Sequence, residues 1–173
     1  MQQQVRAAPE WLETNGLGGF SSGTVSGPRT RRYHALLLVG TDRGRFVLIS
    51  GFDASVETDQ GVFPISCQYY SPGVVSPSGA LGPSSFKLAP WPRWTFELPT
   101  GTQIEQELFV PHRSAMVAMS WRVIDGPSDV RLSMRPFIAG RDYHELMQEN
   151  DVFCFDGELD GKSVTWHPYP GIP

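Results

Sequence analysis

The chain has 173 residues and a mass of 19.2 kDa, which is the usual size of one domain. Apolar residues make up 40% of it and charged residues 18%, a balance that excludes an intrinsically disordered protein. The net charge is −4 and no stretch is rich in Lys and Arg, which argues against partners such as nucleic acids or anionic membranes.

Short apolar runs bounded by glycine and polar residues predict β-strands in the first third of the chain. Segment 14–20 carries an Asn-Gly pair and two adjacent glycines, which are typical of a tight turn. The apolar runs 33–39 and 46–49 follow, and both indicate buried strands. We expect residues 40–44 to close a hairpin between them.

Turn-forming residues continue through the middle of the chain. The triplet 59–61 predicts a second hairpin, and the segment 99–102 predicts a third. Residues 71–85 are mostly Ser, Pro and Gly, so we expect a long surface loop there.

Alternation of side-chain character with a period of two is clearest in the second half. It runs through residues 103–110, 116–121 and 130–135, as expected for strands with one buried face. Only residues 141–150 have the character of a short helix. Strand-like runs that recur with turn chemistry between them predict an all-β fold, an antiparallel β-sandwich with at most that one helix.

Two groups of polar and aromatic residues are candidates for function. The first, Arg31, Arg32, Tyr33 and His34, follows Arg29 and opens a buried strand. Strand alternation would place Arg32 and His34 on one face and Arg31 and Tyr33 on the other. Arg and His donate hydrogen bonds and Tyr offers a flat surface for stacking, a combination suited to a sugar or a partner protein. The structural alternative is an ion-pair cluster that seals the end of the sandwich.

The second group is Arg141, Asp142, Tyr143 and His144. Asp, His and Tyr together could perform general acid–base chemistry, although a helix start with Asp142 in its first turn explains the same residues. We expect both groups to converge at one end of the sandwich, because connecting loops are where a rigid β scaffold presents functional side chains.

Other chemistry is not supported by motifs. The glycines of 16–19 lack the Gly-Lys-Ser/Thr of a phosphate loop, and the four histidines are scattered without metal-ligand spacing. The sequence has no Gly-x-Ser-x-Gly nucleophile motif. We therefore expect no catalytic residue, no cofactor and no metal in this chain.

Residues 10–27 and 30–37 carry two dense motifs, Glu-Trp-Leu-Glu-Thr-Asn-Gly-Leu-Gly-Gly-Phe and Thr-Arg-Arg-Tyr-His-Ala-Leu-Leu. Together with Arg135-Pro136 and residues 141–144, they resemble the N-terminal domain of bacterial and archaeal glycogen debranching enzymes of the amylo-α-1,6-glucosidase type. The resemblance extends over residues 10–145. Ala35 stands where that family usually has Gly.

The resemblance implies a β-sandwich of the glucoamylase and mutarotase type, followed in the family by an (α/α)6 barrel that holds the catalytic carboxylates. On this reading residues 1–173 are a single non-catalytic domain cut from a longer protein. It would pack against its own barrel and shape how a branched α-glucan such as glycogen enters. The residues expected at that rim or interdomain surface are Trp11, Asn15, Arg31, Arg32, Tyr33, His34, Arg141, Asp142, Tyr143 and His144.

Two alternatives remain open from the sequence. The chain could be a free-standing carbohydrate-binding module, or a small mutarotase-like enzyme with His34 or His144 as the acid–base group. An exposed strand edge could also pair two copies of the chain. Met1–Arg6 lacks the apolar stretch of a signal peptide, and two distant cysteines, Cys67 and Cys154, suit buried thiols, so we expect a cytoplasmic protein.

Overall fold

The structure is a computed structural model that describes residues 9–127 and 129–172. The segment Met1–Arg6, for which no signal peptide is expected, lies outside these residues. All regular elements in the described part are β-strands, and adjacent strands pair antiparallel, which confirms the predicted all-β class. No described helix is long and apolar enough to cross a membrane.

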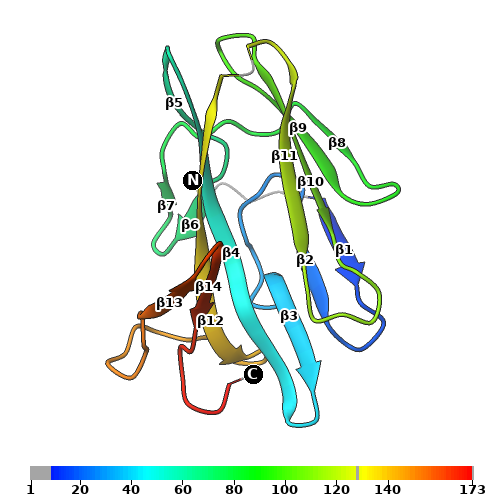
Figure 1. Ribbon diagram of the computed structural model, residues 1–173, viewed down its shortest axis with the longest axis vertical. Coiled ribbons are helices and arrows are strands. Elements are labelled where there is room, and N and C mark those ends of the chain that lie inside the picture. Colours follow the sequence, from blue (N-terminus) through cyan, green and yellow to red (C-terminus); the bar gives the residue numbers. More distant parts are fainter. Residues whose placement is uncertain (1–8, 128, 173) are drawn as a thin grey trace.

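Two sheets form the body of the domain, and Figure 1 shows the long β4 on the left with β9, β10 and β11 on the right. The larger sheet has the order β1-β2-β3-β4-β12, and β5 also pairs with β4. Its strands are β1 (Glu10–Thr14), β2 (Phe20–Thr24), β3 (Ala35–Thr41), β4 (Gly44–Thr58), β5 (Gly61–Pro64) and β12 (Arg131–Asp142). The second sheet has the order β11-β10-β9-β8. Its strands are β8 (Ser85–Lys87), β9 (Arg93–Glu97), β10 (Gln103–Phe109) and β11 (Ala118–Asp125).

Two small hairpins stand apart from these sheets in hydrogen bonding. One pairs β6 (Gln68–Tyr70) with β7 (Val74–Ser76), and the other pairs β13 (Gly157–Asp160) with β14 (Ser163–Trp166). The three hairpins predicted from turn residues are present as β3–β4, β4–β5 and β9–β10. Tight turns rich in glycine therefore fix the register of the larger strands, as the sequence predicts.

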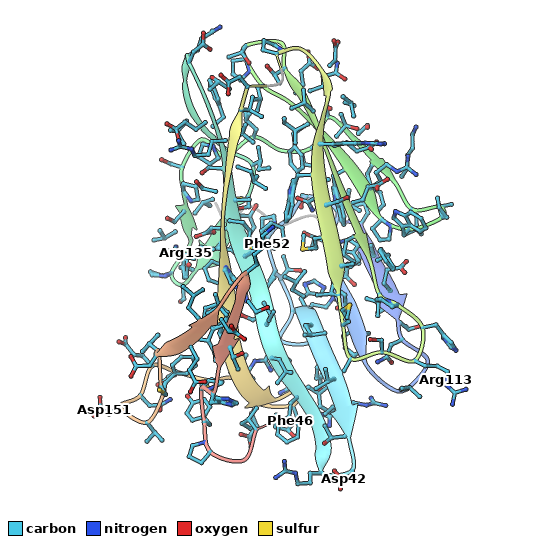
Figure 2. All side chains as sticks on the ribbon, viewed as in Figure 1. Asp42, Phe46, Phe52, Arg113, Arg135 and Asp151 are labelled. Carbon is cyan, nitrogen blue, oxygen red and sulfur yellow. The ribbon has the colours of Figure 1, made fainter. Side chains whose placement is uncertain are left out.

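The core lies between the two sheets. Along β9, Trp94 and Phe96 are buried while their neighbours are not, so the strand turns one face inward. The ring of Trp94 meets Trp11 of β1 edge-to-face, with centroids 5.3 Å apart. Phe52 of β4 contacts Trp121 of β11 in the same way, and Figure 2 shows Phe52 between the sheets. These aromatic contacts join strands that are distant in sequence.

Four local expectations are wrong. The alternation at 130–135 does not give a buried face, because residues 131–135 are all exposed where β12 forms the edge of its sheet. Residues 71–85 do not form one continuous loop, because Val74–Ser76 pairs with β6, as suits β-branched residues. Cys154 is exposed rather than buried, and neither it nor the half-buried Cys67 forms a disulfide. The short helix expected at 141–150 is absent, because residues 141 and 142 complete strand β12 against β4.

Candidate functional site

The glycine-rich segment 14–20 is a loop organised by one side chain, Asn15. Its Oδ1 accepts hydrogen bonds from the backbone N–H groups of Leu17 and Gly19, at 2.8 and 2.9 Å. Its Nδ2 donates to the carbonyl of Ser114, at 2.9 Å, and so ties this loop to the one after β10. Asn15 is 4% exposed. Its polar atoms are therefore used in holding the loop.

The glycines of this loop are required by close approaches. A Cβ on Gly19 would lie 2.6 Å from the Asn15 amide nitrogen and 2.8 Å from the carbonyl oxygen of Leu38. Gly16 has a φ of 74° and lies against the ring of His112. Only glycine fits both positions without displacement. The Asn-Gly…Gly-Gly motif is thus explained by the local backbone.

Trp11 is part of the hydrophobic core. Its ring is buried between the sheets, its Nε1 donates to the carbonyl of Thr24 at 3.2 Å, and Gly23 leaves room for it. Trp11 also lines a cleft of about 360 Å³ together with Arg31, Tyr33 and His34, whereas Asn15 is bonded to the loop after β10.

Residues 31–34 form a turn that precedes β3, with the His34 N–H bonded to the carbonyl of Arg31 at 3.1 Å. The strand alternation expected here is wrong for that reason. Arg31 and His34 lie together and share Glu10, whose Oε1 is 2.6 Å from Arg31 Nε and 3.4 Å from His34 Nε2. Arg32 points elsewhere, toward His144. The turn therefore divides the predicted group into two pairs.

The His34 ring has defined partners on both nitrogens. Nδ1 accepts the N–H of Thr30 at 3.1 Å, so the neutral ring carries its proton on Nε2, facing Glu10. Burial lowers the pKa of His34, although the charge of Glu10 acts in the opposite direction. The hydrogen bond from Arg31 lowers the pKa of Glu10. At neutral pH this is a neutral imidazole against a carboxylate–guanidinium pair.

The two sequence groups do converge, as expected. Arg32 Nη1 donates to the carbonyl of His144 at 2.9 Å, and Arg32 Nη2 donates to the Tyr33 hydroxyl at 3.0 Å. That hydroxyl lies 3.3 Å from His144 Nδ1. The rings of Tyr33 and Tyr143 are 5.6 Å apart, and those of Tyr143 and His144 are 3.9 Å apart. We call the three rings of Tyr33, Tyr143 and His144 the aromatic platform.

Arg141 holds the second segment in place. Its guanidinium is nearly buried and donates to the carbonyls of Asp142, Tyr143 and Glu145, and to that of Arg32 at 2.6 Å. Asp142 Oδ1 accepts the N–H of His144 at 2.8 Å. These bonds occupy the backbone groups that a helix would pair internally, which explains why residues 141–150 form a turn and a loop.

Beside this cluster lies a cleft of about 400 Å³. Arg29, Arg31, Arg32 and Arg141 line one part of it, and residues of the segment 146–155 line another. We call it the arginine cleft. Sequence motifs did not point to the 146–155 segment or to Tyr169, because these side chains reach the cleft only through the tertiary fold. Glu10 was also missed, although it belongs to the same dense motif as Trp11.

The comparison with protein families decides the assignment. The family model for the N-terminal region of glycogen debranching enzyme matches residues 9–173. The chain belongs to that family. The match covers nearly the whole debranching-enzyme domain described above, including both motifs and the two converging turns. Searches of curated proteins and of solved structures found no significant match.

The debranching-enzyme domain has no group of three His, Cys, Asp or Glu side chains arranged to hold a metal ion within residues 9–127 and 129–172. Its distinctive surface chemistry is instead cationic and aromatic. Of the four arginines at the arginine cleft, Arg31 is the one with a carboxylate within 4.0 Å in the described structure, so the ion-pair explanation fits Arg31, Glu10 and His34 but not Arg32 or Arg141.

Proposed function

We propose that this domain assists an α-1,6-glucosidase acting on branched α-glucan, by packing against the catalytic barrel and shaping how the glucan enters. Membership of the debranching-enzyme family supports the setting. The domain itself contributes no acid or base in this proposal. It contributes a surface that the glucan meets on entry, and we assign this role to the aromatic platform with Arg32.

The observation that carries the proposal is the way this platform is supported. Residues more than 100 positions apart are joined by Arg32 and Arg141, whose partners are backbone carbonyls and a tyrosine hydroxyl. His144 remains exposed, and its ring lies edge-on to Tyr33 at 6.0 Å. Flat rings beside guanidinium donors are suited to stacking on a sugar while hydrogen bonding its hydroxyls.

The test is a kinetic comparison in the protein that joins this domain to a catalytic barrel. Tyr143→Ala is expected to raise KM for a branched limit dextrin by about 2- to 10-fold, the range expected from one aromatic contact, with kcat changed less. Tyr69→Ala removes an exposed tyrosine of the β6–β7 hairpin and serves as the matched control. Equal KM values for both variants would argue against a role for the platform in glucan access.

A second candidate, a free-standing carbohydrate-binding module, would use the same rings. Electrophoresis of the 173-residue chain through a gel containing glycogen separates the two. Retardation that Tyr143→Ala abolishes supports direct glucan binding by this chain alone, whereas unchanged mobility supports a surface that works only beside the barrel. A mutarotase-like role for His34 is disfavoured, because both of its ring nitrogens already have protein partners.

A further inference from the structure

The arginine cleft has more positive charge than the protein around it balances. Four arginines line it, and the one carboxylate on its walls is Glu149, which leaves a surplus of three charges in a chain whose net charge is −4. Pairing of Arg31 with Glu10, from outside the cleft, still leaves two. Arg31 and Arg32 are exposed, but Arg29 is half-buried and Arg141 is buried, and charges in such positions are costly unless they are paired.

Arg29 is the least satisfied of the four. Its Nε donates to Gln68 at 3.3 Å, and its guanidinium lies over the Phe137 ring at 5.4 Å. Its two Nη groups have no hydrogen-bond partner among the described residues, so four N–H donors remain for a ligand. Burial lowers the pKa of Arg29, and the nearby charge of Arg141 acts in the same direction. The charge of Asp53 acts on that pKa in the opposite direction, although Asp53 is itself bonded to Arg135 at 2.7 Å.

The other arginines add charge and further donors. Arg141 uses its guanidinium mainly to hold backbone carbonyls, so it contributes positive charge more than free hydrogen bonds. Arg32 keeps N–H groups beyond the two it donates. A guanidinium with free Nη groups can donate two parallel bonds to a phosphate, and the charge of a phosphate monoester matches the surplus of positive charge better than a single carboxylate does.

Part of the remaining wall is aromatic. Phe153, Phe155 and Tyr169 line the cleft, and Phe153 packs against both of the other rings, at 4.5 and 5.3 Å. Phe155 is 76% exposed, so its ring is accessible to a ligand in the cleft. A volume of about 400 Å³ is far more than a bare phosphate fills, and it lies within the range of small-molecule sites.

We propose that the arginine cleft binds a sugar phosphate monoester, with the phosphate on the Nη groups of Arg29 and the sugar ring against the aromatic wall of Phe153 and Phe155. Arg31, Arg32 and Arg141 supply the surrounding positive charge. The site does not include the three rings of the aromatic platform, although it shares Arg32 with that surface. The inference does not depend on the proposed role in glucan access, because it concerns the 173-residue chain alone.

The test is isothermal titration calorimetry on the 173-residue chain with glucose 6-phosphate, inorganic phosphate and glucose. We expect glucose 6-phosphate to bind more tightly than inorganic phosphate, and glucose not to bind. Arg29→Gln is expected to weaken glucose 6-phosphate binding by about 10-fold or more, as for loss of a charged hydrogen-bond donor. Arg113→Gln is the matched control, since Arg113 is exposed and lies on the side opposite Asp151 and the cleft loop in Figure 2.

A second variant covers the case in which Arg29→Gln fails to fold. Phe155→Ala removes an exposed ring. It is expected to weaken the binding of glucose 6-phosphate while leaving the affinity for inorganic phosphate unchanged. The proposal is overturned if the wild-type chain binds no glucose 6-phosphate at about 10 mM ligand, a concentration that would detect even millimolar affinity. It is also overturned if Arg29→Gln and Arg113→Gln lose binding equally. Equal affinity for phosphate and glucose 6-phosphate, unaffected by Phe155→Ala, would show a bare oxyanion site and contradict the sugar.

Discussion

Two motif-rich regions of this domain contrast in how their polar groups are used. In the loop 14–20, Asn15 has partners for both its oxygen and its nitrogen, and a Cβ on Gly16 or Gly19 would lie under 3 Å from a neighbouring atom. In the turns 31–34 and 141–144, Arg32 and Arg141 lack carboxylate partners in the described structure, and the ring of His144 is exposed. The satisfaction of polar groups separates a loop built for folding from a surface suited to binding.

Replacement of Asn15 is expected to have the largest effect on stability. Asn15→Ala removes three hydrogen bonds and leaves buried backbone groups of two loops without partners. We expect a loss of about 3 kcal/mol in the free energy of unfolding, measured by urea titration. Asn15→Asp keeps the acceptor for the N–H groups of Leu17 and Gly19, so it should lose less stability than Asn15→Ala. A loss under about 1 kcal/mol for Asn15→Ala would show that the loop does not depend on this side chain.

A methyl group at Gly19 tests the close packing of the same loop. Gly19→Ala places a Cβ against the carbonyl oxygen of Leu38, so it should cost about 2 kcal/mol, as overpacking does. Gly82→Ala is the matched control, because nothing lies within 4 Å of its added Cβ and its φ is not in the left-handed region. We expect that variant to change stability by under about 1 kcal/mol. Similar melting temperatures for the two variants would contradict the close approach.

Arg141, like Asn15 in the loop 14–20, uses its side chain to bind backbone groups of two segments. Arg141→Gln removes a nearly buried donor to carbonyls of both turns and should cost about 1.5 kcal/mol. Arg131→Gln, which breaks an exposed ion pair with Glu57, provides a control expected near zero. Equal, small effects in thermal unfolding would mean that Arg141 does not hold the two turns together.

The pH dependence of stability reports on His34. Its pKa is lowered in the folded state from the ordinary value of 6.5, so below that pH the unfolded chain binds more protons than the folded one. Stability from this group is therefore fully present above pH 6.5 and falls as the pH decreases, by at most about 1.4 kcal/mol per pH unit.

His34→Asn keeps an acceptor for the Thr30 N–H but cannot be protonated. Urea unfolding at about pH 7.5 and pH 5.5, above the range where Glu10 titrates, should show a smaller acid-induced loss in this variant than in the wild type. Identical losses in the two proteins would mean that His34 has no lowered pKa in the folded state.

Local chemistry made much of the fold predictable. The hairpins at 40–44, 59–61 and 99–102 follow from turn residues, and the buried positions Ile104 and Leu108 of β10 follow from alternation. The error at 141–150 has a tertiary cause, since Arg141 binds carbonyls that local propensity would assign to a helix. The pairing of Arg31 with Glu10, 21 residues earlier, is likewise set by strands β1 and β2, and not by neighbours in sequence.

The central claim is that Arg32 and the aromatic platform form a working surface and not a fold-stabilising cluster. Arg32→Ala tests it most directly, in the protein that joins this domain to a catalytic barrel. We predict a clear loss of debranching activity per folded molecule, with stability changed by only about 0–1 kcal/mol, because Arg32 makes two exposed hydrogen bonds and no carboxylate pair in the described structure. A loss of several kcal/mol with activity per folded molecule intact would contradict the account and make the cluster structural.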